Sequence, residues 1–394
     1  MNRPLSRSFA LLLGLLFVAA AVGAAVSPSS QSVGSTHASR ALKLGIYDDA
    51  EAFGHPSRGF SIFRKLHLPI LRTSLRWGGP LGVARRRPVD ATDPNDPAYN
   101  WGPFDQMMIR AADAGIKVMA TIVGTPRWAN GGKALFVPPK NLSDLRKFSF
   151  AVATRYSGDF VPEGAEDPLP ALRLYLAWNE PNNPVFLRPQ FRKVGKRYVV
   201  QSAIDYARIC NAVYTGVHST KIRGEKVACG GTAPRGNNRA RSARSSVSPL
   251  IFLKALSKRG AHFDAYAHNP YYGNPSETPG KKPPAGTAVT LGNIGDLLRD
   301  LKRYYGPSKH LWITEYGYQT KPPDPLFGVS WTKQAKYLQQ AYRIVRRNPR
   351  IDIMIWFLLR DEPRKAGRDG WQSGLMTIGG KKKPAFRAFT RLER

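Results

Sequence analysis

The sequence predicts a single-domain α/β fold, a (β/α)8 TIM barrel over residues 42–394, from three observations. Short apolar runs alternate with longer amphipathic stretches, which is typical of parallel βαβ units. The mean spacing of about 44 residues between eight such runs fits a closed barrel better than an open sheet. No glycine-rich turn follows the first run, as a doubly wound nucleotide-binding sheet would require.

The predicted strands are short runs dominated by aliphatic and aromatic residues. They lie at 42–47, 70–76, 117–123, 172–178, 226–231, 263–269, 311–315 and 351–357. The predicted helices are the amphipathic stretches between them, at 60–66, 104–114, 142–156, 198–217, 250–258, 294–305 and 332–347, and residues 384–391 are the candidate for the eighth. In such a barrel the C-terminal ends of all strands meet on one rim, where active sites form.

The N-terminal segment is expected to direct export. Arg3 and Arg7 precede an uncharged apolar run at 10–22 and small residues around Ala24, which is typical of a secretory signal peptide over residues 1–26. A retained anchor is the alternative, because the wider apolar run from Phe9 to Val26, about 18 residues, is just long enough to span a bilayer. Residues 27–41 are rich in serine and are predicted to be a disordered tether. Either way, the protein is expected to be secreted or associated with the cell envelope.

The chain has only two cysteines, Cys210 and Cys229, on a predicted helix and the strand that follows it. Outside the cytosol a single disulfide bond can form between such a pair. The sequence does not decide between a bond and two free thiols, because the bond depends on Cα distance and side-chain direction.

The net charge of +33 restricts the partners that the chain can have. Its basic residues suit either adhesion to an anionic cell-envelope polymer or an acidic substrate, such as a glycan that contains uronic acid. Nucleic acid is not an expected partner, because no nucleic-acid-binding motif accompanies the charge. The histidines are scattered without metal-ligand spacing, and neither a metal nor a cofactor is expected. The chain is expected to act as a monomer.

Two glutamates carry the functional prediction. Glu180 stands in Trp178-Asn179-Glu180-Pro181-Asn182, at the end of the fourth predicted strand, and Glu315 ends the seventh in Trp312-Ile313-Thr314-Glu315-Tyr316-Gly317. Both should therefore lie on one rim of the barrel. Two carboxylates that face each other across a cleft are the groups that cleave a glycosidic bond.

Several further segments resemble clan A of the glycoside hydrolases, whose barrels carry Asn-Glu after strand four and Glu after strand seven. The resemblance covers about residues 42–394 and is closest to family 39, with its β-xylosidases and α-iduronidases, or to cellulase-like relatives in family 5. The other matching segments are Leu71-Arg72-Thr73-Ser74-Leu75-Arg76-Trp77, Asn100-Trp101-Gly102-Pro103-Phe104-Asp105 and Gly124-Thr125-Pro126-Arg127-Trp128-Ala129.

The resemblance implies a retaining glycosidase with Glu180 as acid/base and Glu315 as nucleophile. It makes Asn179 the partner of the sugar 2-hydroxyl, Arg72 the partner of the nucleophile, and Trp356 the apolar floor under the reacting sugar. The clan usually has a histidine and a tyrosine after strand six. Here the segment is Ala267-His268-Asn269-Pro270-Tyr271-Tyr272, so Tyr271 fits the tyrosine, while either His268 or Asn269 could take the histidine's place.

The residues themselves suggest how the two carboxyl groups would differ. Trp178 beside Glu180 should raise its pKa by desolvation, whereas Arg72 near Glu315 should favour the ionised form. Aromatic rings near the predicted strand ends are candidates to stack on sugars, and about half of them are expected to line the cleft. They are Trp77, Trp101, Trp128, Tyr271, Tyr316, Tyr318 and Trp371.

Two alternatives compete with the exported retaining glycosidase. One is a barrel that binds carbohydrate without cleaving it, but such a protein would be expected to lose one of the two carboxylates. The other is a basic cell-envelope adhesion protein, which gives no reason for glutamates at these two strand ends.

Overall fold

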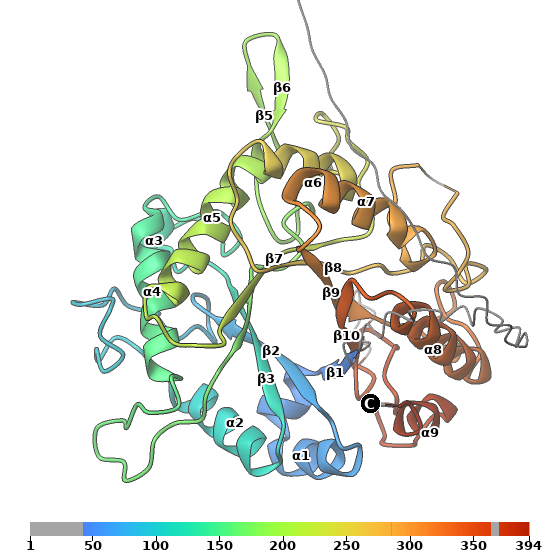
Figure 1. Ribbon diagram of the computed structural model, residues 1–394, viewed down its shortest axis with the longest axis horizontal. Coiled ribbons are helices and arrows are strands. Elements are labelled where there is room, and N and C mark those ends of the chain that lie inside the picture. Colours follow the sequence, from blue (N-terminus) through green and yellow to red (C-terminus); the bar gives the residue numbers. More distant parts are fainter. Residues whose placement is uncertain (1–41, 285, 364–369, 394) are drawn as a thin grey trace, which may run out of the picture. The chain divides into compact units, whose positions relative to one another are not determined.

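The computed structural model describes residues 42–284, 286–363 and 370–393, and within them eight parallel strands close into a barrel (Figure 1). Each barrel strand pairs with the barrel strands that come before and after it in the sequence, and the last pairs with the first. In order they are β1 (Lys43–Tyr47), β2 (Ile70–Arg76), β3 (Lys117–Val123), β4 (Leu174–Ala177), β7 (Lys226–Thr232), β8 (Ala265–His268), β9 (His310–Tyr316) and β10 (Ile351–Phe357). The (β/α)8 prediction is confirmed.

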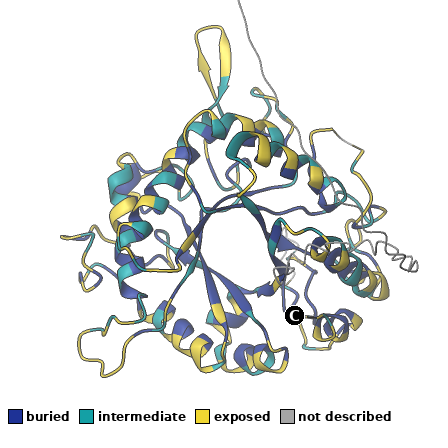
Figure 2. Cartoon of the chain, in the orientation of Figure 1, coloured by how far each residue is buried: buried dark blue, intermediate teal, exposed yellow. Residues whose placement is uncertain are grey.

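Helices surround the barrel and are exposed on the side away from it (Figure 2). They are α1 (Pro56–Lys65), α2 (Gly102–Asp113), α3 (Arg127–Asn130), α4 (Leu142–Arg155), α5 (Gln201–His218), α6 (Pro249–Ser257), α7 (Ile294–Tyr305), α8 (Trp331–Arg346) and α9 (Pro384–Thr390), with a π-helical turn at Ala50–Gly54 and a 3-10 turn at Leu291–Asn293. The candidate eighth helix at 384–391 is therefore present as α9.

One element was predicted wrongly. Residues 198–200 belong not to a helix but to an antiparallel hairpin of β5 (Phe191–Val194) and β6 (Arg197–Val200), and α5 begins only at Gln201. Gly195 at the turn has a φ of 56°, a conformation that glycine adopts without steric cost and that suits a two-residue hairpin turn.

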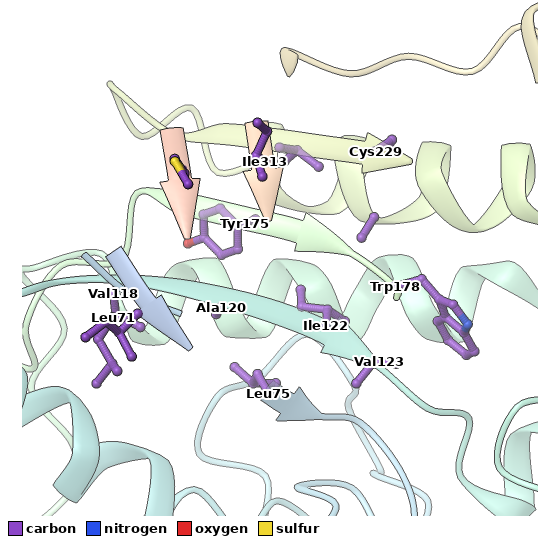
Figure 3. Close-up of a cluster of buried hydrophobic side chains, with 14 of the residues drawn as sticks. Leu71, Leu75, Val118, Ala120, Ile122, Val123, Tyr175, Trp178, Cys229 and Ile313 are labelled. Carbon is purple, nitrogen blue, oxygen red and sulfur yellow. The ribbon is translucent and has the colours of Figure 1, made fainter. Parts of the chain in front are cut away.

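Alternation along each strand divides the core into two layers. Ile70, Met119 and Leu176 belong to the cluster inside the barrel. Residues of opposite parity, such as Leu71 and Ile122, pack outward against the helices (Figure 3). On β2 the same alternation points Arg72, Ser74 and Arg76 into the mouth of the barrel.

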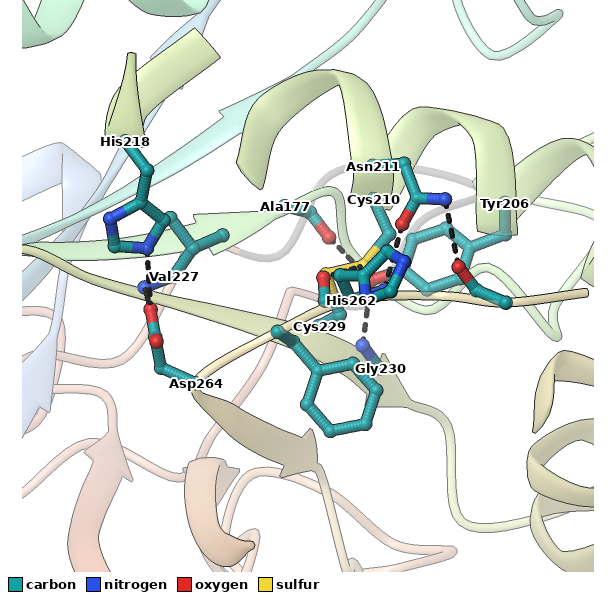
Figure 4. Close-up of a disulfide and its surroundings, with 12 residues drawn as sticks. Ala177, Tyr206, Cys210, Asn211, His218, Val227, Cys229, Gly230, His262 and Asp264 are labelled. Atoms are coloured by element: carbon teal, nitrogen blue, oxygen red, sulfur yellow. Dashed lines mark hydrogen bonds and ion pairs between the residues drawn. A yellow bond between two sulfur atoms is a disulfide. The ribbon is translucent and has the colours of Figure 1, made fainter. Parts of the chain in front are cut away.

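The structure contains a disulfide bond between Cys210 on α5 and Cys229 on β7, with a Cα–Cα distance of 6.0 Å (Figure 4). Next to it, the Tyr206 hydroxyl donates to the Ala177 carbonyl at 2.7 Å and accepts from the Gly230 amide at 2.6 Å. Helix α5 is thus tied to the C-terminal ends of β4 and β7, and β4 is the strand that leads to Glu180.

The predicted signal peptide (residues 1–26) and tether (residues 27–41) lie outside the described residues. Among those that are described, no helix has the length and hydropathy needed to cross a membrane.

Candidate active site

A pocket of about 510 Å³ opens at the C-terminal ends of the barrel strands. Glu180 and Glu315 both line it, together with Arg72, Asn179 and Tyr271. The structure therefore brings together five of the nine residues predicted for the site. Other lining residues include Tyr47, Ser74, Arg76, Phe136, Asn183, Arg235, Phe357 and Trp371.

Glu180 reaches the pocket because the chain turns sharply after β4. Trp178 and Glu180 have φ values of 66° and 40°, in the left-handed region that residues other than glycine rarely adopt. The turn sends Trp178 into the outer hydrophobic layer, where its indole meets Phe136, and leaves Asn179 and Glu180 at the pocket. Strained backbone of this kind is typical of functional sites and costs about 1–3 kcal/mol per residue.

Two amides hold the Glu180 carboxyl group. Asn183 Nδ2 donates to Oε2 at 2.9 Å and Asn269 Nδ2 donates to Oε1 at 3.3 Å. Burial, and secondly the charge of Glu315, raise the pKa of Glu180 to about 7, while the two amides and Arg72 act in the opposite direction. Glu180 can therefore carry a proton near neutral pH, as an acid/base group requires.

A bulge in β9 decides the direction of Glu315. Ile313 pairs with Met354 and Tyr316 with Trp356, so β9 has one residue more than β10 between these pairs. Ile313 and Tyr316 both face the outer layer. With regular alternation Glu315 would point outward like Ile313, and the extra residue turns it into the pocket instead.

Arg72 on β2 is the main partner of Glu315. Its guanidinium is 2 % exposed and donates to Glu315 Oε1 at 2.6 Å, to the Thr314 carbonyl at 2.8 Å and to Asn179 Oδ1 at 3.0 Å. Tyr271 donates its hydroxyl to the other oxygen, Glu315 Oε2, at 3.2 Å. One guanidinium thus connects the nucleophile candidate with the residue that precedes the acid/base candidate.

The segment after β8 resolves the ambiguity between His268 and Asn269. Ala265 and Ala267 point into the barrel, and Asn269 follows them on the same side, where it contacts Glu180 and accepts from the Thr314 hydroxyl at 2.7 Å. His268 points the other way, hydrogen bonded to Thr232 at 2.7 Å and to the Val289 carbonyl at 3.0 Å. Of the two residues that the sequence left open, Asn269 is therefore the one that contacts Glu180, and the expectation that His268 lies at the site is wrong.

Three tryptophans predicted to bind substrate do not line the pocket. Trp356 faces the outer layer and donates to the Ser373 carbonyl at 3.0 Å, because alternation along β10 turns the next residue, Phe357, into the pocket. Trp77 is also in the outer layer, stacked on Phe148. Trp128 packs edge-on against Trp77 and donates to the Ala84 carbonyl at 2.9 Å.

A different set of rings forms the apolar wall of the pocket. Tyr47 stacks on Phe357 with ring centroids 5.2 Å apart, and Tyr271 lies 5.4 Å from Trp371. Trp371 is 40 % exposed, so part of its side chain remains accessible to a ligand. Of the seven aromatic candidates from the sequence, only Tyr271 and Trp371 line the pocket, fewer than the half that was expected.

A second cavity of about 560 Å³ adjoins the pocket and shares Ser74 and Arg76 with it. Phe53, Leu81 and Phe104 contribute apolar surface to this cavity. The two cavities therefore lie next to each other at the ends of β1 and β2, with Ser74 and Arg76 between them.

Asp49 lines the second cavity and fixes the boundary between the two. Its carboxylate accepts from the Tyr47 hydroxyl at 3.0 Å and from the Ser74 amide at 2.9 Å, and it lies 3.5 Å from Arg76. Asn183 was not predicted as a site residue, and Asn269 was predicted only as an alternative to His268. Asn183 had one usable signal, since it stands three residues after Glu180 in the same polar segment.

In the described parts of the chain, no group of three or more His, Cys, Asp or Glu side chains is placed to hold a metal ion. The pocket instead offers a carboxyl group that can carry a proton near neutral pH, a second carboxyl group paired with a buried guanidinium, and aromatic walls. This combination can protonate a leaving oxygen and supply negative charge beside a developing cation.

Comparison with known proteins gives structural matches only. No protein-family model matches the chain, and no curated protein matches its sequence. Among solved structures, a glucosidase from Croceicoccus marinus is 16 % identical, with a TM-score of 0.63 over 89 % of this chain and 67 % of its own. A family 39 glycoside hydrolase from Bacteroides cellulosilyticus WH2 is 17 % identical, with a TM-score of 0.58 over 89 % of this chain and 63 % of its own.

A fungal β-1,4-galactanase structure is 14 % identical, with a TM-score of 0.57, and 89 % of this chain covers 100 % of it. The chain spans about two thirds of the length of the first two enzymes, 67 % and 63 % respectively. At such low identity the likeness concerns the fold. The chain has the (β/α)8 barrel fold of these glycoside hydrolases, and family 39 is among its structural neighbours, as the sequence motifs predicted.

Proposed function

We propose that the chain is a retaining glycoside hydrolase that cleaves O-glycosidic bonds of an oligo- or polysaccharide with Glu180 and Glu315. One observation carries the proposal: two carboxyl groups line one pocket in opposite electrostatic surroundings. Burial raises the pKa of Glu180 to about 7, whereas the buried guanidinium of Arg72 neutralises Glu315 at 2.6 Å. Unequal surroundings of this kind divide a pair of carboxyl groups into an acid and a nucleophile.

In the first step, a Glu315 oxygen bonds to the anomeric carbon while the bond from that carbon to the leaving oxygen breaks. The electron pair of the broken bond goes to the leaving oxygen, which takes the proton from Glu180. Arg72 and Tyr271 hold Glu315 by its two oxygens, and Asn179, held by Arg72, lies where it can donate to a sugar hydroxyl.

In the second step, water attacks the anomeric carbon and the bond to Glu315 breaks, with Glu180 accepting the water proton. The structure supports this change of role. The negative charge of Glu315 is the second cause of the raised pKa of Glu180, and this charge disappears while Glu315 is esterified by the sugar. The pKa of Glu180 should then fall, which makes it a carboxylate when a base is needed.

A substrate longer than one sugar unit is proposed because a second cavity lies beside the pocket of the two glutamates. The pocket of about 510 Å³ and the second cavity of about 560 Å³ have Ser74 and Arg76 in common. Short aryl glycosides should therefore be poorer substrates than oligosaccharides that fill both cavities, since remote contacts contribute binding energy to catalysis.

Export is part of the proposal. It is supported by the signal-like N-terminal segment and by the Cys210–Cys229 disulfide bond, since such bonds persist mainly outside the cytosol. Mass spectrometry of the protein from culture medium and from membranes would show whether residues 1–26 are removed. An uncleaved protein in the cytosolic fraction would contradict this part of the proposal.

The activity is tested with a panel of aryl glycosides and polysaccharides, using the wild-type chain, Glu180→Gln and Glu315→Gln. Each variant should lose at least about a thousandfold in kcat/KM. Glu163→Gln is the matched control, because Glu163 is an exposed glutamate outside the pocket, and it should retain full activity. Near-wild-type turnover by either pocket variant would refute the mechanism.

A slow-turnover 2-fluoro glycoside tests the retaining course. It should leave one sugar covalently attached to Glu315, detectable as a mass increase on the peptide that contains this residue. Labelling of another residue, or inversion at the anomeric carbon of the product, would contradict the double-displacement mechanism.

A further inference from the structure

We propose that the protein binds a carboxylated polysaccharide on a basic surface outside the catalytic pocket. This basic surface consists of the β5–β6 hairpin and the arginine-rich loop after β7. Its cations are Arg192, Lys193, Lys196, Arg197, Arg239, Arg241 and Arg244. The choice of a polysaccharide rests on the proposed glycosidase function, whereas the existence of an anion-binding surface does not.

The hairpin presents its charges fully to solvent. It projects away from the barrel, and residues 192–198 are all exposed (Figures 1 and 2). Cross-strand pairing places Lys193 opposite Tyr198, and Val194 opposite Arg197. Each face of the hairpin therefore carries at least one cation beside an apolar or aromatic side chain.

The arginine-rich loop packs beside the hairpin and is held in place by its own hydrogen bonds. The Arg241 guanidinium lies 5.8 Å from the ring centroid of Tyr198, which joins the two segments by a cation–π contact. Asn237 Oδ1 accepts from the amides of Arg239 at 3.0 Å and Ser246 at 3.2 Å. The cations thus extend from an organised loop.

Among the described residues, acidic side chains balance little of this charge: Asp205 on α5 is linked to Arg192 through Gln201, which accepts from Arg192 at 2.8 Å and donates to Asp205 at 2.8 Å. None of the seven cations forms an ion pair with any residue that the structure describes. The sequence contains no Asp or Glu at 181–204 or at 226–263, the segments that include the hairpin and the loop. Mutual repulsion among unpaired cations is relieved by a partner with repeated negative charges, more than by a single small anion.

The position of the basic surface connects it with the pocket. The hairpin follows β4, and the loop follows β7, so both belong to the rim that carries the active site. Arg235, in the same loop, lines the pocket, where its guanidinium donates to Glu277 at 3.2 Å and to the Tyr271 carbonyl at 3.2 Å. A polymer bound at Arg239–Arg244 can therefore continue along this loop towards the glutamates.

The test compares two variants with the same change in net charge. One replaces the four hairpin cations, Arg192, Lys193, Lys196 and Arg197, by Gln. The control replaces four exposed cations on and just after α8 by Gln: Lys333, Lys336, Arg343 and Arg347. Binding to polygalacturonate, to a neutral β-glucan and to a DNA duplex is measured at several salt concentrations, and turnover of an uncharged aryl glycoside is measured in parallel.

The wild-type chain should bind polygalacturonate more tightly than DNA, and increasing salt should weaken the binding. The hairpin variant should lose at least about tenfold in affinity and the control less than about twofold, with aryl glycoside turnover unchanged in both. A second variant, with Arg239, Arg241 and Arg244 replaced by Gln, should show the same loss as the hairpin variant.

Equal weakening by the hairpin and control variants would overturn the proposal, because net charge alone would then explain binding. The proposal would also be overturned if DNA bound as tightly as polygalacturonate or more tightly. If no glycoside is turned over while the hairpin-dependent binding of polygalacturonate remains, the proposed function fails and the basic surface stands. If turnover is normal and polygalacturonate does not bind, the basic surface fails and the proposed function stands.

Discussion

Replacing Glu180 by Gln should change how the stability of the folded protein depends on pH. In the wild-type chain, burial and the charge of Glu315 raise the pKa of Glu180 from the ordinary 4.5 to about 7. The stabilising effect of protonated Glu180 is complete below pH 4.5. It is lost as the pH rises through 7, because folding then requires a buried carboxylate.

The magnitude follows from the pKa values. One pKa unit is worth about 1.4 kcal/mol, so the change from 4.5 to about 7 costs the folded state about 3 kcal/mol at high pH. Glutamine has no charge and avoids this cost, although its amide group cannot accept from both Asn183 and Asn269 as the carboxylate does. That loss is about 1–3 kcal/mol and does not depend on pH.

The informative quantity is therefore a double difference. Urea unfolding of wild type and Glu180→Gln at pH 4 and pH 8 gives the effect of the substitution on the free energy of unfolding at each pH. From pH 4 to pH 8, the free energy of unfolding of the variant should rise by about 3 kcal/mol relative to that of wild type. Glu163→Gln, at an exposed site, should show no such change.

One result would refute the reasoning directly. If the effect of Glu180→Gln is the same at pH 4 and pH 8, Glu180 is not held in the protonated form by its surroundings. The assignment of Glu180 as the acid would then lose its physical basis, even if the variant were inactive.

Three further predictions concern activity and stability. The kcat/KM for a neutral glycoside should fall about tenfold per pH unit above about pH 7, because the first step needs protonated Glu180; a rate that stays flat to pH 9 would contradict this. Arg72→Lys should lower kcat/KM more than about a hundredfold, since one ammonium group cannot replace the contacts to both Glu315 and Asn179. Steady-state kinetics would measure this loss, and a urea unfolding curve should match that of wild type. Replacing Cys210 and Cys229 by Ser should destabilise the protein by about 3 kcal/mol, as expected for a bond that closes a loop of 19 residues. An unfolding transition at the same temperature in calorimetry would contradict this prediction.

The strands were predictable because each is a short run of apolar residues between turns. All eight barrel strands occur where the sequence placed them, to within a few residues. The β5–β6 hairpin was missed since its two short segments, Phe191-Arg192-Lys193-Val194 and Arg197-Tyr198-Val199-Val200, mix apolar with cationic residues and are largely exposed. Part of it merged with the amphipathic pattern of α5.

The side-chain directions were less predictable, because a shift of one residue reverses the face of a strand. Trp356 was assigned to the floor of the pocket, but it faces the outer layer, and Phe357 lines the pocket instead. Glu315 faces the pocket only because β9 has a bulge, and Glu180 only because two residues after β4 have positive φ. Neither a bulge nor a left-handed turn at non-glycine residues has a reliable signal in a single sequence.

The sequence by itself determined the barrel, the two glutamates on one rim and the basic character of the chain, because periodicity, strand order and composition are local or additive properties. Only the tertiary structure decided which neighbours give Glu180 and Glu315 different surroundings, that Asn269 rather than His268 reaches the acid, and which rings line the cleft. These outcomes depend on contacts between residues far apart in sequence. Such contacts are fixed by strand register and packing, and not by the identity of any one residue.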